Sequence, residues 1–421
     1  MSNLIITGGS RLCGIIEVPG AKNSVLPVLA ATLLNKGTSI LENCPELDDV
    51  TTMLEILEAL GCGIRRKGSR IEVDASQLTA SSIPEELAKK MRSSIIILGS
   101  LLARCGEAYL SYPGGCEIGM RPIDMHLKAL MQMGAKVDGI SDGMLRCRAE
   151  KLTGCEILLD YPSVGATENI MLAASMAEGE TIIQNAAKEP EIDDLQAFLR
   201  KMGVNVSGAG TGVIRIQGAR KIKAEPVHRI IPDRIVTGTY LAAAAATGGS
   251  IVVTNVIYDH VGSVLYCLKR CGCRIKNYSG NVIALESSGR LTALDLVRTS
   301  PYPGFPTDMQ PQLVALLSKC KSTSVVVETV FENRFRYTEQ LMKLGADITI
   351  QGRTAIIRGV DKLKGAQLEA RDLRGGAALV IGALSAEGTS SISGVGYIDR
   401  GYERMEKVLS SVGANIRRVE A

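Results

Sequence analysis

One short segment of the chain combines a cysteine with residues that are typical of an exposed loop. Cys116 is preceded by Pro113-Gly-Gly and followed by Gly119 and Arg121-Pro122. Proline and glycine at this density predict a flexible, exposed loop. An arginine close to a thiol favours the thiolate, so the segment indicates a reactive acid or nucleophile. A chance surface thiol is the competing interpretation.

A lysine begins a predicted helix near the N-terminus. Lys22 and Asn23 lie in Gly20-Ala-Lys-Asn-Ser, directly before the helical pattern of residues 25–34. A cation beside the free N–H groups of a helix N-terminus is suited to binding an anion. A lysine at such a position is also commonly a solvated side chain, so this pattern alone leaves both interpretations open.

Several arginines lie where solvation does not require them. Arg92 and Arg374 head apolar helical stretches, whereas Arg334 and Arg400 follow acidic or polar residues. The guanidinium fork suits phosphate and carboxylate oxygens. Structural ion pairing with neighbouring acids is the alternative, most directly for Arg334 beside Glu332.

A proline-rich loop surrounds one aspartate. Asp308 lies in the segment 301–311, which contains four prolines. A rigid loop of this kind could direct Asp308 into a cleft as a general base. The competing explanation is an N-cap role ahead of a predicted helix over residues 310–317.

Other catalytic classes lack their sequence signatures. The three histidines at 126, 228 and 260 have no triad or metal-ligand spacing, and the eleven scattered cysteines fit reduced thiols rather than a zinc site. No P-loop occurs, and no GxGxxG follows a predicted strand, which argues against a Walker-type kinase and a Rossmann dehydrogenase.

The elements that must position these residues form a repeat. An amphipathic stretch ending in glycine, then a small residue and a β-branched strand, recurs every 68 to 73 residues. Glycine here supplies the left-handed conformation that ends a helix. The six glycines are Gly61, Gly134, Gly203, Gly272, Gly345 and Gly413.

A second recurrence lies upstream in each unit. Small-residue helical stretches at 237–247 and 375–386 come before strands such as 249–255, and similar strands are predicted at 37–43 and 179–185. Six units of about 70 residues, with seams near residues 19–21 and 228–233, predict two α/β lobes with ligands in the cleft between them.

Composition limits the cellular setting. The 421 residues are 46% hydrophobic and 22% charged, and the net charge is +4. These values fit a globular protein and give no nucleic-acid footprint. Because no apolar run reaches membrane-spanning length and no signal peptide precedes the chain, we expect a cytoplasmic protein without membrane or nucleic-acid partners.

Together these segments resemble the UDP-N-acetylglucosamine enolpyruvyl transferases, a branch of the EPSP synthase superfamily. The resemblance covers essentially the whole chain. It rests on Lys22-Asn23, Met91-Arg92, the Pro113–Cys116 loop with Arg121-Pro122, Ser163–Thr167, Pro306–Asp308, Phe331–Arg334, Asp372–Arg374 and Ile398–Glu403.

The resemblance implies a fold and domain bounds. In this family six βαβαββ units of about 70 residues form a two-lobed, inside-out α/β barrel with the active site in the inter-lobe cleft. One lobe, which carries the Cys116 loop, would span residues 22–231, and the other would comprise residues 1–21 and 232–421. Neither a metal nor an organic cofactor is required.

The implied reaction transfers the enolpyruvyl group of phosphoenolpyruvate to the 3′-hydroxyl of UDP-N-acetylglucosamine and releases phosphate. It is the first committed step of peptidoglycan precursor synthesis. By the resemblance, Lys22, Cys116, Asp308 and Arg400 are catalytic. Asp308 would accept the sugar hydroxyl proton. Cys116 would donate a proton, form an adduct with phosphoenolpyruvate and be alkylated by fosfomycin.

The resemblance also implies the binding residues. Lys22, Asn23, Arg121 and Arg400 would hold phosphoenolpyruvate. The nucleotide sugar would contact Asn23, Arg92, Arg121, Pro122, Ile123, Asp124, Met125, Ser163, Val164, Gly165, Asp308 and Val330. Further cleft residues would be Arg334, Asp372 and Arg374.

Three positions depart from the family pattern. Ile96 stands where well-studied members have tryptophan, and Asp48 and Tyr161 stand where they have lysine. Two alternatives remain. A 5-enolpyruvylshikimate-3-phosphate synthase shares the fold but lacks the Gly-Gly-Cys loop. A silent, UDP-sugar-binding regulatory paralogue would have no reason to keep all four catalytic residues.

Overall fold

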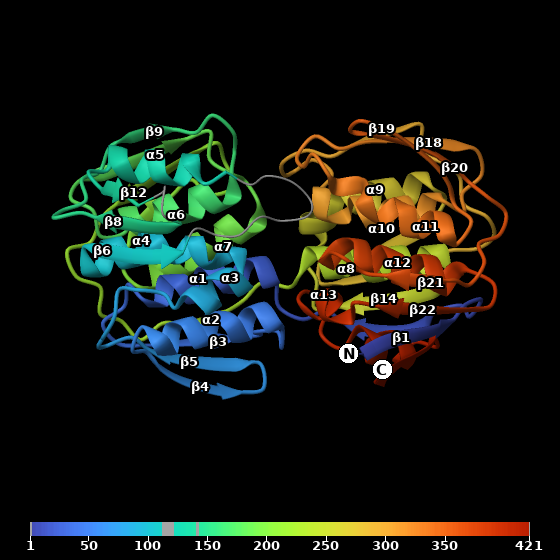
Figure 1. The fold of residues 1–421 in the computed structure, drawn as a ribbon, viewed down its shortest axis with the longest axis horizontal. Coiled ribbons are helices and arrows are strands. Elements are labelled where there is room, and N and C mark those ends of the chain that lie inside the picture. Colours follow the sequence, from blue (N-terminus) through green and yellow to red (C-terminus); the bar gives the residue numbers. More distant parts are fainter. Residues whose placement is uncertain (1, 112–121, 140–142, 421) are drawn as a thin grey trace. The chain divides into compact units, whose positions relative to one another are not determined.

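The computed structural model describes residues 2–111, 122–139 and 143–420, which form two compact units (Figure 1). The unit with residues 20–111 and 122–231 is called the Lys22 unit. The unit with residues 2–19 and 232–420 is called the Asp308 unit.

The Lys22 unit contains three sheets, ordered β13-β3-β5-β4, β6-β8-β7 and β11-β12-β10-β9. Its helices are α1 (Lys22–Thr32), α2 (Asp48–Ala59), α3 (Glu85–Lys90), the 3-10 helix η1 (Arg92–Ile96), α4 (Ile97–Cys105), α5 (Asp124–Gln132), α6 (Val164–Ala174) and α7 (Pro190–Lys201). Its strands are β3 (Thr38–Glu42), β4 (Gly63–Lys67), β5 (Arg70–Asp74), β6 (Glu107–Ser111), β7 (Lys136–Asp138), β8 (Met144–Arg148), β9 (Glu156–Leu158), β10 (Glu180–Gln184), β11 (Asn205–Ser207), β12 (Val213–Gln217) and β13 (Val227–Arg229).

The Asp308 unit also contains three sheets, ordered β15-β16-β14-β2, β17-β18-β20-β19 and β21-β22-β1-β23. Its helices are α8 (Arg234–Ala246), η3 (Tyr258–Val261), α9 (Gly262–Arg270), η4 (Thr307–Met309), α10 (Gln310–Leu317), η5 (Arg334–Tyr337), α11 (Thr338–Lys343), α12 (Leu373–Ser385), α13 (Val395–Asp399) and α14 (Met405–Ser411). Its strands are β1 (Ser2–Thr7), β2 (Cys13–Glu17), β14 (Ser250–Thr254), β15 (Arg274–Tyr278), β16 (Val282–Glu286), β17 (Leu296–Arg298), β18 (Thr323–Val327), β19 (Asp347–Gln351), β20 (Thr354–Arg358), β21 (Gln367–Glu369), β22 (Thr389–Ser393) and β23 (Asn415–Glu420).

The sheets share one pairing pattern, which confirms the predicted repeat. In five of them an edge strand pairs in parallel with its neighbour and the other two pairings are antiparallel, as in β9, β10, β12 and β11. In the three-stranded sheet, an isolated parallel bridge from Ser82 to Tyr109 replaces the parallel edge strand. The β1 strand lies between β22 and β23, so the beginning of the chain completes the last unit.

The six recurring glycines adopt the conformation that their position predicts. Their φ angles lie between 87° and 106°, in the region that favours glycine. Gly61 shows the arrangement: it follows Leu60, the C-cap of α2, and β4 begins at Gly63. The glycine therefore ends the helix and lets the chain turn into the next strand.

Each unit is built around three inner helices that are largely buried. In the Asp308 unit these are α8, α10 and α12, which contact one another (Figure 1). Every residue of α10 is buried, as is every residue of α12 from Arg374 to Ser385. Alanine and glycine in α8 and α12 allow close packing, and a helix without a polar face must be buried. The Lys22 unit has α1, α4 and α6 as its inner helices.

Local differences from the predicted elements have identifiable causes. Arg92 begins a 3-10 helix, and α4 starts only at Ile97. Helix α14, which precedes the recurring Gly413, begins at Met405, directly after Arg404, whose φ of 41° lies outside the helical region. No helix in the described part of the chain has both the length and the apolarity that a bilayer-spanning helix needs.

Candidate functional site

Asp308 lies in η4, at the start of the buried helix α10. Its carboxylate accepts hydrogen bonds from two buried arginines. Arg334 donates from Nη2 to Oδ1 at 3.0 Å, and Arg374 donates from Nη2 and Nε to Oδ2 at 3.1 and 3.2 Å. The arginine side chains are 2% exposed, whereas that of Asp308 is 27% exposed. The carboxylate is thus held by two buried cations while the side chain remains partly exposed.

The ion pairs of Arg334 correct one sequence interpretation. Glu332, its neighbour in sequence, pairs with Arg353 at 3.0 Å, whereas Arg334 pairs with Asp308. The side chain of Arg334 turns into the unit and lies 5.6 Å from the Phe331 ring. Sequence proximity favoured the wrong acid because Glu332 is on the surface.

The alternative of an N-cap role for Asp308 is also wrong. Helix α10 begins after Met309, and no side chain accepts a capping hydrogen bond there. A capping role of this kind is seen for Asp372 at the start of helix α12. Its Oδ1 accepts hydrogen bonds from the backbone N–H groups of Arg374 and Gly375 at 3.0 and 2.9 Å. Asp372 therefore fixes the first turn of α12, from which Arg374 reaches Asp308.

A buried tyrosine lies beside this cluster. The Tyr402 ring lies 5.5 Å from the guanidinium carbon of Arg374, and its hydroxyl hydrogen-bonds Thr239 at 2.9 Å and Gln312 at 3.1 Å. Burial opposes the charged form of Arg374, but Tyr402 and Asp308 outweigh it, so the pKa of Arg374 is raised. The guanidinium is held as a permanent cation.

Arg400, the expected ligand of phosphoenolpyruvate, follows the short helix α13. The preceding residue, Asp399, accepts two hydrogen bonds from Arg418 at 2.8 and 2.6 Å, and Arg418 also bonds Glu406. Tyr402 anchors the chain two residues further on. The backbone around Arg400 is therefore held on both sides.

Lys22 is the first residue of α1 and is buried. Its Nζ lies 2.6 Å from Oδ2 of Asp49, which is in the first turn of α2. Both side chains are less than a tenth exposed, so this ion pair is screened little by water. The solvated alternative for Lys22 is thereby excluded in this structure. Asn23, the next residue, is partly exposed.

A buried carboxylate on the neighbouring helix α7 fixes the start of α1. Asp194 on α7 accepts a short hydrogen bond from Ser24 Oγ, and its Oδ1 lies 2.9 Å from Nε2 of His228. All three residues are at least 96% buried. Because Ser24 is two residues after Lys22, this network fixes the first turn of α1, which carries Lys22 and Asn23, the expected ligands of phosphoenolpyruvate.

The sequence assigns no role to His126, which in the structure lies beside Gly165, an expected nucleotide-sugar contact. Its Nδ1 lies 2.9 Å from Nδ2 of Asn169, and a Cβ at Gly165 would come within 3.2 Å of its ring. Burial, with Arg92 next in importance, lowers the pKa of His126 to about 4. The imidazole is therefore neutral at physiological pH and can donate from Nε2.

Asn169 joins the elements that carry these expected contacts. It accepts from the backbone N–H of Gly99 at 2.6 Å and donates to the Ile95 carbonyl at 2.9 Å. Arg92, at the start of η1, and Ser163, the N-cap of α6, thus belong to one hydrogen-bonded assembly. No motif or spacing in the sequence marks His126 and Asn169. What sets them apart from other histidines and asparagines is their burial, which only the folded structure shows.

The remaining predicted residues are distributed between the two units. Pro122 and Asp124 are exposed, Ile123 is buried, and Met125, Val164 and Gly165 are partly buried in the Lys22 unit. Val330 is in the Asp308 unit, where its N–H donates to Glu328 at 2.8 Å. Of the three departures from the family pattern, Ile96 is buried, and Asp48 and Tyr161 are exposed.

Cys116 and Arg121 lie outside the described residues. The other ten cysteines are free thiols. Burial raises the pKa of Cys44, Cys62, Cys147, Cys267 and Cys273 to about 12, so these thiols are poor nucleophiles at neutral pH.

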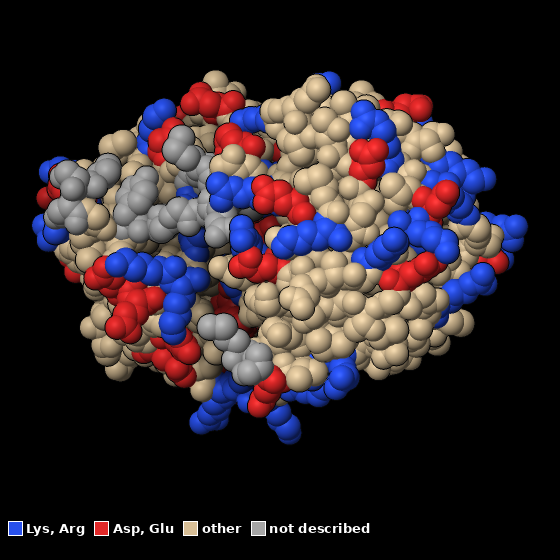
Figure 2. Space-filling model, turned by 45° about the vertical axis from the view of Figure 1, so that its right-hand side comes forward, with Lys and Arg blue, Asp and Glu red and all other residues tan. Residues whose placement is uncertain are grey.

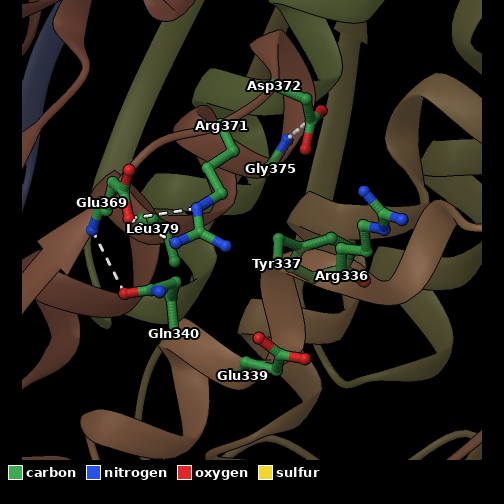
Figure 3. Close-up of a pocket in the computed structure, with 9 residues that line it drawn as sticks. All are labelled: Arg336, Tyr337, Glu339, Gln340, Glu369, Arg371, Asp372, Gly375 and Leu379. Carbon is green, nitrogen blue, oxygen red and sulfur yellow. Dashed lines mark hydrogen bonds and ion pairs between the residues drawn. The ribbon is translucent and has the colours of Figure 1, made fainter. Parts of the chain in front are cut away.

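A small pocket lies beside the first turn of α12, next to Asp372 (Figure 3). Its volume of about 20 Å³ is enough for one water molecule. Figure 3 shows the Glu369–Arg371 ion pair on one side and the Asp372 carboxylate turned toward the backbone of Gly375. The pocket is too small for a nucleotide sugar, and its polar groups serve the helix terminus.

A larger cavity of about 320 Å³ lies at the C-terminal ends of α8, α10 and α12. Its cations bind backbone carbonyls: Lys319 donates to Ser385, the last residue of α12, at 2.7 Å, and Arg290 donates to Lys319 and Cys320, just after α10, and to Gly359. Cations at helix C-termini offset the negative end of the dipole. These groups are thus occupied in stabilising the helix ends.

Surface charge gives no further indication of a binding site. Basic and acidic side chains are interspersed on the face drawn in Figure 2. Among the described residues, no three His, Cys, Asp or Glu side chains are placed to hold a metal ion.

The chain is similar in sequence and fold to known enolpyruvyl transferases. The model of the EPSP synthase (3-phosphoshikimate 1-carboxyvinyltransferase) family matches residues 6–409, and the chain belongs to this family. Over 419 residues, which cover 100% of both chains, it is 53% identical to UDP-N-acetylglucosamine 1-carboxyvinyltransferase 2 of Caldanaerobacter subterraneus subsp. tengcongensis.

Two further comparisons agree with this assignment. The chain is 48% identical, over 100% of both chains, to UDP-N-acetylglucosamine 1-carboxyvinyltransferase 2 of Carboxydothermus hydrogenoformans. Its structure is similar to the enolpyruvyl transferase NikO from Streptomyces tendae, with a TM-score of 0.90 and 25% identity over 100% of this chain and 99% of that one.

Proposed function

We propose that this chain transfers the enolpyruvyl group of phosphoenolpyruvate to the 3′-hydroxyl of UDP-N-acetylglucosamine and releases phosphate, a step of peptidoglycan precursor synthesis. The observation that carries the proposal is the 53% identity over the full length to a transferase of that name. We also propose that the protein works in the cytoplasm, and that residues 22–231 form one lobe and residues 1–21 with 232–421 the other.

Asp308 is the proposed general base. During addition, the sugar oxygen attacks C2 of phosphoenolpyruvate and its proton passes to the Asp308 carboxylate, while C3 gains a proton from the Cys116 thiol. Elimination then returns a proton from C3 to the Cys116 thiolate and breaks the C2–O bond to phosphate, which leaves and restores the double bond. The partial exposure of the Asp308 side chain and the two arginines that orient its carboxylate support this role.

The anionic substrate would be bound by cations from both units. Lys22, Arg121 and Arg400 would neutralise the phosphate and carboxylate of phosphoenolpyruvate and stabilise the negative charge on the phosphate as it leaves. Arg92, Asn23, Ser163–Gly165, Pro122–Met125 and Val330 would contact the nucleotide sugar. Neutral His126 fits this set as a hydrogen-bond donor. No metal or organic cofactor enters any of these steps.

Phosphate release tests the reaction and its acceptor. Purified protein is given phosphoenolpyruvate with either UDP-N-acetylglucosamine or shikimate 3-phosphate. We expect release with the nucleotide sugar alone. Release only with shikimate 3-phosphate would favour the EPSP synthase alternative, and binding of the nucleotide sugar without any release would favour the silent regulatory paralogue.

Fosfomycin labelling tests the role of Cys116. We expect Cys116 to be alkylated first when UDP-N-acetylglucosamine is present, because the buried thiols have raised pKa values. Peptide mapping by mass spectrometry identifies the labelled residue. Cys13, an exposed thiol on β2, is the internal control, and its labelling before Cys116 would contradict the assignment.

A further inference from the structure

Glu328 is a buried carboxylate that directly follows strand β18 and is only 1% exposed. Four donors surround it. Oε2 accepts from Thr307 Oγ1 at 2.9 Å. Oε1 accepts from Thr299 Oγ1 at 2.9 Å and from the backbone N–H groups of Val330 and Phe331 at 2.8 and 3.2 Å. A buried charge is tolerated when hydrogen bonds replace its hydration in this way.

The two oxygens of this carboxylate hold different parts of the proposed site. Oε2 holds Thr307, which immediately precedes the proposed base Asp308 and whose carbonyl also accepts from Arg334 at 3.3 Å. Oε1 holds the backbone of Val330, a proposed nucleotide-sugar contact. One side chain therefore joins the segment that carries the base to the segment that would contact the acceptor.

We infer that Glu328 is a positioning residue that aligns Asp308 through Thr307 and Val330 through its other oxygen. This inference rests on the proposed function. Glu328 itself is enclosed by its donors, so it acts through its neighbours and not on the substrate. Hydrogen bonds to a carboxylate are short and strong, which suits a group that must hold a base within a few tenths of an ångström.

Variants of Thr307 test the Oε2 connection alone. Thr307→Val removes the donor and keeps the shape, whereas Thr307→Ser keeps the hydroxyl. We expect Thr307→Val to lower kcat about tenfold or more, the equivalent of one charged hydrogen bond, with the Kd for UDP-N-acetylglucosamine unchanged within about twofold. Thr307→Ser should retain nearly full activity. Thr247→Val is the matched control, because Thr247 bonds only helix carbonyls at the far end of α8.

Glu328→Gln tests both connections together. The amide can still accept at one position but carries no charge, so we expect kcat to fall and the calorimetric Kd for UDP-N-acetylglucosamine to rise severalfold. If Thr307 acts through Glu328, the Thr307→Val/Glu328→Gln double variant should be no slower than the slower single variant. A double variant slowed by the product of both effects would overturn the inference.

Other outcomes also decide the matter. Variants that lose thermal stability but keep kcat and Kd would show a purely structural role and overturn the inference while the wild type remains active. A wild type that releases no phosphate with UDP-N-acetylglucosamine would overturn the proposed function, and the inference with it.

Discussion

Asp308 and Lys22 are both proposed catalytic groups that the structure holds in ion pairs, but the two groups differ in charge and exposure. Asp308 is a partly exposed acid held by two buried arginines. Lys22 is a buried base held by the equally buried Asp49. In the Asp308 unit two buried cations bind a partly exposed carboxylate, whereas in the Lys22 unit a buried cation meets a buried carboxylate.

The two units have one feature in common. In each, a buried carboxylate that is not proposed to touch substrate accepts a hydrogen bond from a hydroxyl group near the proposed catalytic residue and so fixes the segment that carries it. Glu328 does so through Thr307, and Asp194 does so through Ser24. The ion pairs therefore determine the charge around Asp308 and Lys22, whereas the hydroxyl hydrogen bonds fix the position of the segments that carry these two residues.

The largest expected effect tests the proton-transfer role of the Asp308 unit. Asp308→Asn keeps the shape but removes the base, so kcat should fall about 10²- to 10⁴-fold while the Kd for UDP-N-acetylglucosamine changes little. Steady-state kinetics and calorimetry measure the two quantities. Asp361→Asn, a surface variant in the same unit, is the control. Equal losses in both quantities would indicate a binding role instead.

The next effect is on stability and distinguishes the buried Lys22–Asp49 ion pair from the Asp308 carboxylate, which two arginines bind. Lys22→Met removes the cation beside a buried carboxylate and should cost about 3–5 kcal/mol in urea unfolding. Arg334→Met leaves Arg374 at Asp308 and should cost less. Adding Asp49→Asn to Lys22→Met should restore part of the loss. A smaller loss for Lys22→Met than for Arg334→Met would contradict the comparison.

The Lys22 unit contains a residue, His126, that should make the stability of the protein depend on pH. Burial lowers the pKa of His126 from 6.5 to about 4, so between these values the unfolded chain binds a proton that the folded chain does not. Stability should therefore fall as the pH drops from about 6.5 to 4, by roughly 3 kcal/mol from this group. In His126→Asn the fall should be smaller by that amount. An unchanged pH dependence would show that His126 is protonated in the folded chain.

The smallest effect concerns the hydroxyl that fixes α1. Ser24→Ala removes one buried donor to Asp194 and should cost about 1–3 kcal/mol of stability. It should also raise the KM for phosphoenolpyruvate more than that for UDP-N-acetylglucosamine. Ser10→Ala serves as the control, because Ser10 lies on the loop between β1 and β2 in the other unit. A uniform change of both KM values would argue against placement of Lys22 by Ser24.

The repeat could be predicted from the sequence because it depends on the backbone conformation at the end of each helix and not on contacts between distant residues. A helix that turns at once into a strand needs a left-handed residue, so glycine recurs at six positions and can be found without any contact. The partner of Arg334 could not be found in this way, because Asp308 is 26 residues distant and Glu332 is only two. Glu328 and Asp194 look like ordinary acids in sequence, and only the packing of distant segments buries them.

The central claim is the choice of acceptor, and a competition measures it most directly. The wild-type protein is given limiting phosphoenolpyruvate and an equimolar mixture of UDP-N-acetylglucosamine and shikimate 3-phosphate, and the products are identified by mass spectrometry. The account predicts that the enolpyruvyl group appears on the nucleotide sugar alone. Its appearance on shikimate 3-phosphate, with the nucleotide sugar unmodified, would contradict the account.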